Sequence, residues 1–310
     1  SRSMDILLQQ IINGLVQGAI YAMVALGYTM VYGIMGLINF AHGEVVMIGT
    51  LVAITVVTVL VKAGLPVMLA GAGGIVAAAA VCMALGWTLE RVAYRPLRNA
   101  PRLTPLITAI GCSIVLQNVA MMVWGRNYMT FPPLVEKTQF EIAGASFTSV
   151  QVMIVLVAAL SMGGLLFLVY RTRLGMAMRA TAQNPAVAGL MGVNANRVIS
   201  SAFVIGSALG AIAGVMVGTY YEIAHYQMGF MLGLKAFTAA VLGGIGNLAG
   251  AMAGGVLLGL IEALGAGYIG DLTGGFLGSH YQDIFAFVVL ILVLMFRPSG
   301  LFGEKTGDRA

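Results

Sequence analysis

The sequence is poor in charge: only 9% of its 310 residues are Asp, Glu, Lys or Arg, whereas 60% are hydrophobic. No stretch is long and polar enough to form a separate soluble domain. This composition excludes an ordinary water-soluble protein and indicates a polytopic helical membrane protein. The net charge of +5 is therefore interpreted as a determinant of orientation in the bilayer, and nucleic acid is not expected as a partner.

Motifs for catalysis, metal binding and nucleotide binding are missing as well. The two cysteines, Cys82 and Cys112, lie in apolar runs without the spacing of metal ligands. The segment Gly206-Ser-Ala-Leu-Gly210 has the outline of a serine-nucleophile turn but no suitable histidine partner. The phosphate-loop pattern is absent, so this chain has no such route to ATP hydrolysis. We expect a non-enzymatic protein without a metal or cofactor of its own; if ATP drives it, ATP and magnesium are bound by partner subunits.

Long apolar runs, by contrast, occupy almost the whole chain. Six of them have the length of a single membrane span: residues 6–27, 66–90, 103–124, 150–170, 198–221 and 281–296. Two more, at residues 28–61 and 236–269, would each form a straight helix about 51 Å long, against a hydrocarbon core of about 30 Å. Both are predicted to break at glycine-rich segments, residues 33–43 and 243–250. The predicted fold is all-α, a helical bundle of about 8 to 10 spans with two broken or re-entrant helix pairs.

The two breaks resemble each other, because Gly36-Leu-Ile-Asn-Phe-Ala41 aligns with Gly244-Ile-Gly-Asn-Leu-Ala249. An internal repeat explains the match, and chance similarity in a Gly/Ala-rich chain is the alternative. A single membrane domain, residues 4–310, would then consist of a first half (4–170), a polar loop (171–197) and a second half (198–310). Residues 1–3, before Met4, are interpreted as a cloning remnant.

Clusters of basic residues predict which loops face the cytoplasm. The clusters are Arg91, Arg95, Arg98 and Arg102; Arg171, Arg173, Arg179 and Arg197; and Arg297, Lys305 and Arg309. If each broken run enters and returns on the outer side, both termini are cytoplasmic. The longest outer segment, residues 125–149, is predicted to contain a small hairpin. It either receives a partner protein or only connects two spans.

The polar loop carries the signals of a short helix. Asn184 suits the N-cap, Pro185 the first helical position and Gly192 the stop. The resulting helix of about two turns is shorter than the roughly 12 to 15 residues at which an isolated helix is marginally stable. It must therefore pack on the membrane domain or on a partner. We interpret it as a docking helix for a cytoplasmic partner, with an ordinary connecting loop as the alternative.

Polar residues inside the spans are costly in lipid and are candidate functional residues. At the first break, Asn39, His42 and Glu44 are predicted to line a substrate pathway, together with Asn247 at the second. The Glu44 carboxylate would compensate the ammonium group of a substrate, and a helix N-terminus would compensate its carboxylate. This arrangement suits a zwitterion. In the alternative, Glu44 only pairs with His42 or caps the local helix. Glu262 is expected to have a helix-packing or interfacial role.

Four segments resemble the H-type permease of the bacterial branched-chain amino acid ABC importer. They are Gly27-Tyr-Thr-Met-Val-Tyr-Gly-Ile-Met-Gly-Leu-Ile-Asn-Phe-Ala-His-Gly-Glu44, Glu90-Arg-Val-Ala-Tyr-Arg-Pro-Leu-Arg98, Leu190-Met-Gly-Val-Asn194 and Lys235-Ala-Phe-Thr-Ala-Ala-Val-Leu-Gly-Gly-Ile-Gly246. The resemblance covers the chain from Met4. It implies a half-pore for leucine, isoleucine and valine in the bacterial inner membrane. Its implied partners are an M-type permease, two cytoplasmic ATPase subunits, a periplasmic amino-acid-binding protein and membrane lipid.

The family's cytoplasmic coupling loop, which engages the ATPase, maps onto this chain as well. The matching positions are Gly175, Arg179, Ala180, Asn184, Ala188 and Gly192. Arg173 and Pro185 complete the predicted coupling set, and Pro185 is included only for its place at the helix start. Three alternatives stay open: an ion-coupled secondary transporter, a permease for a related small solute such as urea, and a passive channel.

Overall fold

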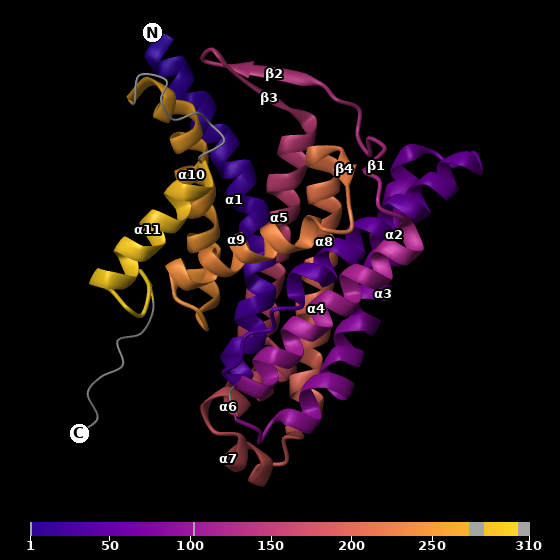
Figure 1. Cartoon of the computed structure of the whole chain (residues 1–310), viewed down its shortest axis with the longest axis vertical. Coiled ribbons are helices and arrows are strands. Elements are labelled where there is room, and N and C mark those ends of the chain that lie inside the picture. The colour runs from indigo at the N-terminus through magenta and orange to yellow at the C-terminus, as the bar shows by residue number, and fades with distance from the viewer. Residues whose placement is uncertain (1, 102, 273–281, 303–310) are drawn as a thin grey trace.

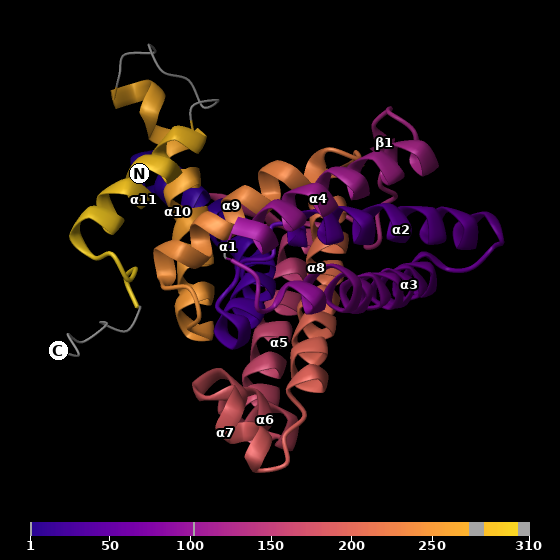
Figure 2. The same cartoon turned by 60° about the horizontal axis from the view of Figure 1, so that its bottom comes forward.

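The computed structural model describes residues 2–101, 103–272 and 282–302. The long helix α1 (Arg2–Met35) runs through the bundle, with α10 and α11 on one side and α2 and α3 on the other (Figures 1 and 2). Within the described ranges, seven helices are long and apolar enough to cross a membrane. This confirms the predicted all-α membrane bundle. Three basic residues of the predicted clusters, Arg102, Lys305 and Arg309, lie outside the described residues.

The other elements follow in chain order. The helices are α2 (His42–Lys62), α3 (Val67–Thr88), η1 (Leu89–Tyr94), η2 (Arg95–Leu97), α4 (Leu103–Trp124), α5 (Ser149–Arg171), α6 (Arg173–Gln183), α7 (Pro185–Leu190), α8 (Ala195–Tyr221), α9 (Met228–Gly243), α10 (Leu248–Leu272) and α11 (Gln282–Phe296). The strands are β1 (Met129–Thr130), β2 (Gln139–Ile142), β3 (Ala145–Thr148) and β4 (Ile223–Ala224). They form two short antiparallel pairs, β1 with β4 and β2 with β3.

The first break lies at residues 36–41, inside the predicted segment. Helix α1 ends at Met35, and the φ of +68° at the next residue, Gly36, stops the helix in the left-handed region at no steric cost. The prediction of a separate span ending at Gly27 is wrong, because α1 continues through that position. Glycine is needed at this position inside the helix because the His42 ring packs directly on Gly27, and any Cβ there would overlap the ring. The chain between Gly36 and His42 therefore returns alongside α1 before α2 begins.

The continuous α1 changes the predicted topology. Its N-terminal part lies beside the β2–β3 hairpin, since Gln9 donates from Nε2 to the carbonyl of Ser146 (3.0 Å) and accepts from its backbone N–H (2.8 Å). Helices α6 and α7 lie at the other end of the bundle (Figure 1). The prediction that the N-terminus shares a side with residues 171–197 is therefore wrong. The error came from dividing the N-terminal region into a span at residues 6–27 and a hairpin at residues 28–61. In the structure α1 crosses the bundle once and includes the first part of that expected hairpin.

The described C-terminal residues lie on the second break, at the α6 end. The backbone N–H groups of Leu301 and Phe302 donate to the carbonyls of Leu242 and Gly243 at 2.9 and 3.1 Å. This break, at residues 244–247, lies inside the predicted segment 243–250 and is shorter than it. The predicted hairpin in residues 125–149 is also confirmed, and it turns through Ala143 and Gly144, which both have positive φ.

Glycines bring α1 and α10 into backbone contact. A Cβ added at Gly18 would lie 2.7 Å from the Val256 Cα, and one at Gly259 would overlap the backbone of Gly18. Both helices carry glycines four residues apart, Gly14 with Gly18 and Gly255 with Gly259. Small residues at this spacing allow close approach of membrane helices, where dispersion contacts replace the hydrophobic effect.

Replacing Gly259 by alanine is expected to lower the free energy of unfolding by about 1–3 kcal/mol. The reason is that the new Cβ would overlap backbone atoms of Gly18, which cannot rotate aside. The Tm of the purified protein measures the effect. Gly163→Ala in α5 is the matched control, because a Cβ there meets nothing within 4 Å; we expect it to be neutral or slightly stabilising. An unchanged Tm for Gly259→Ala would contradict the α1–α10 contact.

Candidate functional site

The first break is a fixed turn held by Asn39. The side-chain Oδ1 of Asn39 accepts hydrogen bonds from the Ala41 N–H (3.1 Å) and from the Tyr94 hydroxyl (2.6 Å). The Asn39 carbonyl accepts from the His42 N–H (3.1 Å) and so begins α2. Asn39 is 4% exposed, and its amide group is engaged in the turn and in a contact with η1. The structure thus uses the Asn39 side chain, which was predicted to line the substrate pathway, to hold the turn.

His42 is a buried packing residue at the junction of α1, α2 and α8. Its ring lies on Gly27 of α1, and a Cβ added at Gly210 of α8 would be 3.0 Å from the ring. The Tyr28 ring meets it edge-on with a centroid distance of 5.0 Å. No ion pair joins His42 to Glu44 within the described part of the chain. The alternative in which Glu44 only pairs with His42 is therefore not what the structure shows.

Glu44 points instead into the contact between α2, α4 and α9. Its Oε1 accepts hydrogen bonds from Ser113 Oγ (3.0 Å) and Gln117 Nε2 (2.7 Å), both on α4. Its Oε2 is buried and has no hydrogen-bond partner among the described residues. A Cβ added at Gly229 of α9 would overlap the Gly43 carbonyl oxygen and lie 3.0 Å from Glu44 Oε2, so glycine allows α9 to approach the start of α2 beside the carboxylate. One carboxylate oxygen is thus held in place by α4, while the other is buried without a hydrogen-bond partner among the described residues.

A cavity of about 720 Å³ opens in front of Glu44. Its wall combines this single carboxylate with a few polar groups and a majority of aromatic and aliphatic side chains. The lining residues are Tyr28, Phe40, Glu44, Ile110, Ser113, Ile114, Gln117, Gln227, Gly229, Phe230, Met231, Gly233, Leu234 and Phe237. A carboxylate in an apolar pocket fits a small molecule with one cationic group and an apolar body. Several rim residues are exposed, Ile110, Ile114 and Phe230 among them.

Asn247 lies at a different place from the cavity. Its Oδ1 accepts from the Gly250 N–H (3.1 Å), which caps the start of α10. Its Nδ2 donates to the carbonyl of Phe302 (3.2 Å). The structure therefore brings Glu44 to the cavity, places Asn39 and His42 immediately behind it, and uses Asn247 to tie the second break to the C-terminal segment.

Glu262 is buried on α10 among polar groups of α1 and α9. The Tyr21 hydroxyl donates to Glu262 Oε2 at 2.6 Å, and Gln17 Nε2 donates to the same oxygen at 3.0 Å. Lys235 Nζ lies 3.4 Å from Oε1. Glu262 does not line the cavity, and its contacts join three helices.

The polar loop folds into two helices, α6 and α7. The α7 helix has the predicted ends, because Asn184 Oδ1 accepts from the Val187 N–H (3.2 Å) and Gly192 has a φ of +91°. Pro185 occupies the first helical position and Ala188 is the buried residue of α7. The preceding helix α6 was not predicted, although Thr172 is a recognisable N-cap that accepts from the Gly175 N–H at 3.1 Å.

The other predicted coupling residues mainly hold α6 against the bundle. A Cβ at Gly175 would overlap the carbonyls of Leu168 and Val169, so only glycine allows α6 to turn back on α5. Arg179 donates from Nε to the Val169 carbonyl (3.1 Å), and its guanidinium lies 5.6 Å from the centre of the Tyr170 ring. Ala180 is half-buried, and Arg173 is exposed.

An exposed apolar surface on α7 was missed from the sequence. Val187, Leu190 and Met191 are 51%, 86% and 81% exposed. Helix α7 lies at the end of the bundle formed by the polar loop (Figure 1). Large apolar side chains with this exposure beside a capped two-turn helix are typical of a protein contact surface. The signal was present in the sequence as the apolar positions of the predicted helix.

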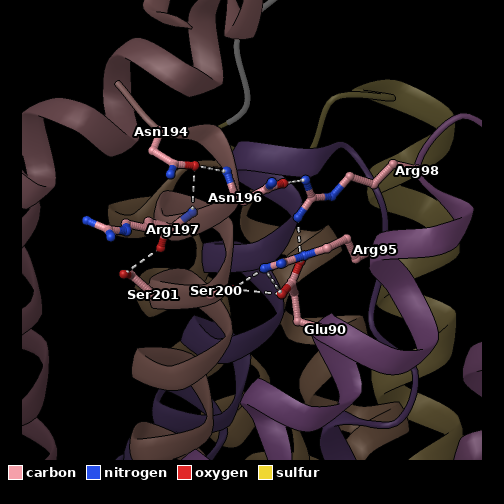
Figure 3. A network of polar contacts seen from close by, with 8 residues as sticks. All are labelled: Glu90, Arg95, Arg98, Asn194, Asn196, Arg197, Ser200 and Ser201. Carbon is pink, nitrogen blue, oxygen red and sulfur yellow. Dashed lines mark hydrogen bonds and ion pairs between the residues drawn. The ribbon is translucent and has the colours of Figure 1, made fainter. Parts of the chain in front are cut away.

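A buried ionic cluster ties η1 and η2 to the start of α8 (Figure 3). Glu90 is fully buried and pairs with Arg95 (Nη2 to Oε2, 3.0 Å) and with Arg98. Ser200 Oγ donates to Glu90 Oε2 at 2.7 Å, and Arg98 also contacts Asn196. The residue after α7 and its turn, Asn194, caps α8 in the same region. The α3–α4 connection and the α7–α8 connection are therefore joined by charge-assisted hydrogen bonds.

The chain is similar to known proteins over nearly its whole length. Residues 10–294 match the family described as branched-chain amino acid transport system / permease component. This chain belongs to that permease family. The high-affinity branched-chain amino acid transport system permease protein BraD of Pseudomonas aeruginosa is 47% identical over 309 residues, which is 97% of each chain. The corresponding LivH protein of Escherichia coli K12 is 46% identical over 307 residues, again 97% of each chain.

A more distant relative is also similar over most of the chain. The probable branched-chain amino acid transport permease protein LivH of Methanocaldococcus jannaschii is 26% identical over 309 residues, covering 94% of this permease and 91% of the relative. The resemblance expected from the four sequence segments is thereby confirmed. The permease residues that the sequence did not reveal are Ser113 and Gln117, which hold Glu44. Their signal was two polar side chains four positions apart on one helix face of an apolar run.

Proposed function

We propose that this permease forms half of the pathway of an ABC importer that carries leucine, isoleucine and valine across the bacterial inner membrane. The observation that carries the proposal is the largely apolar cavity lined by Glu44, whose Oε2 has no hydrogen-bond partner among the described residues. The ammonium of the amino acid binds this oxygen, and the branched side chain packs on residues such as Phe40 and Phe237. Family membership and the transport systems to which the similar proteins belong support this cargo.

A second permease subunit, of the M type, completes the pathway in this proposal. The cavity rim on α4 and α9 exposes Ile110, Ile114, Phe230 and Met231. Apolar side chains around an opening are what a helical partner covers in a membrane. A periplasmic amino-acid-binding protein delivers the cargo to the end of the bundle that carries the β2–β3 hairpin, which is then the outer end.

Two cytoplasmic ATPase subunits, with their ATP and magnesium, supply the energy. One of them docks on the exposed surface of α7, and the loop of residues 171–197 is then cytoplasmic. Movement of α7 reaches the bundle through α6, because Met178 and Arg179 share a small cavity with Gly33 of α1 and Gly246 of the second break. The coupling loop thus contacts the end of α1 and the turn before α10.

Replacing Leu190 and Met191 together by serine is expected to lower ATP-dependent leucine uptake by at least about 10-fold, since two apolar anchors each contribute about 1–2 kcal/mol to a protein contact. The folded permease should persist because both side chains are exposed. Uptake into vesicles reconstituted with all subunits, and retention of the ATPase on purification, measure the effect. The control is Met4→Ser, an exposed methionine at the opposite end. Full ATPase retention by the double variant would rule out α7 as the docking surface.

The same vesicles separate the alternatives. Uptake that requires ATP and is insensitive to ionophores supports an ABC importer. Uptake without ATP that an ionophore abolishes would identify an ion-coupled secondary transporter, and efflux of leucine from vesicles holding this chain alone would identify a passive channel. Competition by urea but not by isoleucine would replace the proposed cargo with a related small solute.

A further inference from the structure

A second cavity, of about 650 Å³, lies at the α6–α7 end of the bundle and is separate from the Glu44 cavity. It opens between the end of α3, the start of α6 and the start of α8. Its lining residues are Trp87, Arg91, Arg95, Leu174, Asn194, Asn196, Arg197, Ser200, Ser201, Val204 and Ile205. No carboxylate is among them. The cavity is therefore cationic on one part of its wall and apolar on another.

The charge of the wall is only partly compensated. Glu90 lies behind it, fully buried, and is shared by Arg95 and Arg98. Within the described ranges Arg91 and Arg197 form no ion pair, and both are exposed. The Arg197 guanidinium lies away from the Glu90 cluster in Figure 3. Two arginines are thus available to bind an anion, and the fork of a guanidinium matches the oxygens of a phosphate group.

The apolar part of the wall indicates what kind of phosphate would fit. Leu174, Val204 and Ile205 line the cavity beside Trp87, whose indole is 43% exposed and lies 5.2 Å from the Arg91 guanidinium. Tryptophan at the end of a membrane span is typical of the headgroup level. A free phosphate ion would leave this apolar surface unfilled, whereas the acyl chain of a phospholipid would cover it.

We propose that this cavity binds one anionic phospholipid, with its phosphate on Arg91 and Arg197 and an acyl chain against Leu174, Val204 and Ile205. The asparagines and serines at the start of α8 surround the headgroup. The lipid then bridges α3, α6 and α8 next to the loop that leads into α7. This inference needs only that the chain spans a membrane and is independent of which solute it carries.

The test uses the small number of tryptophans. The protein has two, so a Trp124→Phe variant leaves Trp87 as the single fluorophore. Lipid discs are prepared from phosphatidylcholine with a small fraction of either bromine-labelled phosphatidylglycerol or bromine-labelled phosphatidylcholine. We expect Trp87 to be quenched more strongly by the labelled phosphatidylglycerol. In this background Arg91→Gln with Arg197→Gln should weaken the preferential association by at least about 10-fold, each arginine contributing roughly fivefold.

Three controls make the result decisive. Arg171→Gln removes an exposed arginine from the same end but not from the cavity, and it should retain the full preference. Equal quenching by the two labelled lipids would overturn the proposal, as would a preference that survives the double variant. Millimolar inorganic phosphate at constant ionic strength should leave the preference in place, because the acyl-chain contacts hold the lipid; loss of the preference would show that the free anion displaces the headgroup and would overturn the acyl-chain part of the proposal. Single variants at Arg91 or Arg197, each expected to lose about fivefold, replace the double variant if it does not fold.

Discussion

Glu44→Gln is expected to reduce ATP-dependent leucine uptake by about 10- to 100-fold while the permease still folds and assembles. A hydrogen bond to a charged group contributes about 1.5–3 kcal/mol, which corresponds to this range. The variant keeps the shape of the side chain and its contacts with Ser113 and Gln117 on α4. What it removes is the charge of a carboxylate that lines the cavity and whose Oε2 has no hydrogen-bond partner among the described residues.

The measurement is the initial rate of uptake at several leucine concentrations in vesicles that contain all subunits. A loss of uptake with unchanged ATPase retention locates the defect in the pathway. The control is Asn118→Ala on α4, the helix that carries the Glu44 partners Ser113 and Gln117. It is suitable because, among the described residues, the Asn118 side chain hydrogen-bonds the Ile114 carbonyl of its own helix and does not line the cavity. Normal uptake kinetics in Glu44→Gln would assign Glu44 to structure alone.

The Arg95→Gln/Arg98→Gln double variant is expected to lose about 3–5 kcal/mol of stability, the typical cost of leaving a buried charge unpaired. Glu90 is completely buried and would keep only its hydrogen bond from Ser200. The connection between η1 and α8 would loosen, and with it the start of α8 beside the coupling loop. Thermal unfolding of the purified permease, followed by the aggregation temperature, measures the loss.

A third substitution makes this prediction specific. Adding Glu90→Gln to the double variant removes the unpaired buried charge and should restore a large part of the lost stability. The triple variant is therefore expected to be more stable than the double variant. Lys137→Gln serves as the control for simple loss of an ion pair, since Lys137 and Glu222 are 3.7 Å apart and both about 60% exposed. Its effect should stay within about 1 kcal/mol. A triple variant no more stable than the double would contradict the burial argument.

Features that depend on neighbouring residues could be predicted from the sequence. The all-α membrane fold followed from hydropathy, because a continuous apolar run of about 20 residues has the length of a helical span, in which every backbone group bonds within its own segment. The break near Gly36 and the cap of α7 at Asn184 were located because positive φ favours glycine and because a side-chain amide can accept from the first turn. The β2–β3 hairpin followed from its turn residues in the same way.

Features that depend on distant segments could not be predicted. The sequence placed Glu44 at a break but left its neighbours open, and these lie on α4. Asn247 has the same sequence context as Asn39, yet it caps α10 and binds the C-terminal segment. The side of the N-terminus was mispredicted, because one uncertain helix end changes the number of crossings by one.

The sequence by itself therefore determined that this protein is a helical membrane permease, where its helices break and which loop carries a capped short helix. Only the tertiary structure decided which polar residue faces a cavity, which are buried behind it, and which ends of the chain lie together. The physical reason is range: hydropathy, caps and left-handed glycines act within a few residues. The environment of Glu44 and of Glu90 is set by helices that meet only when the whole bundle packs.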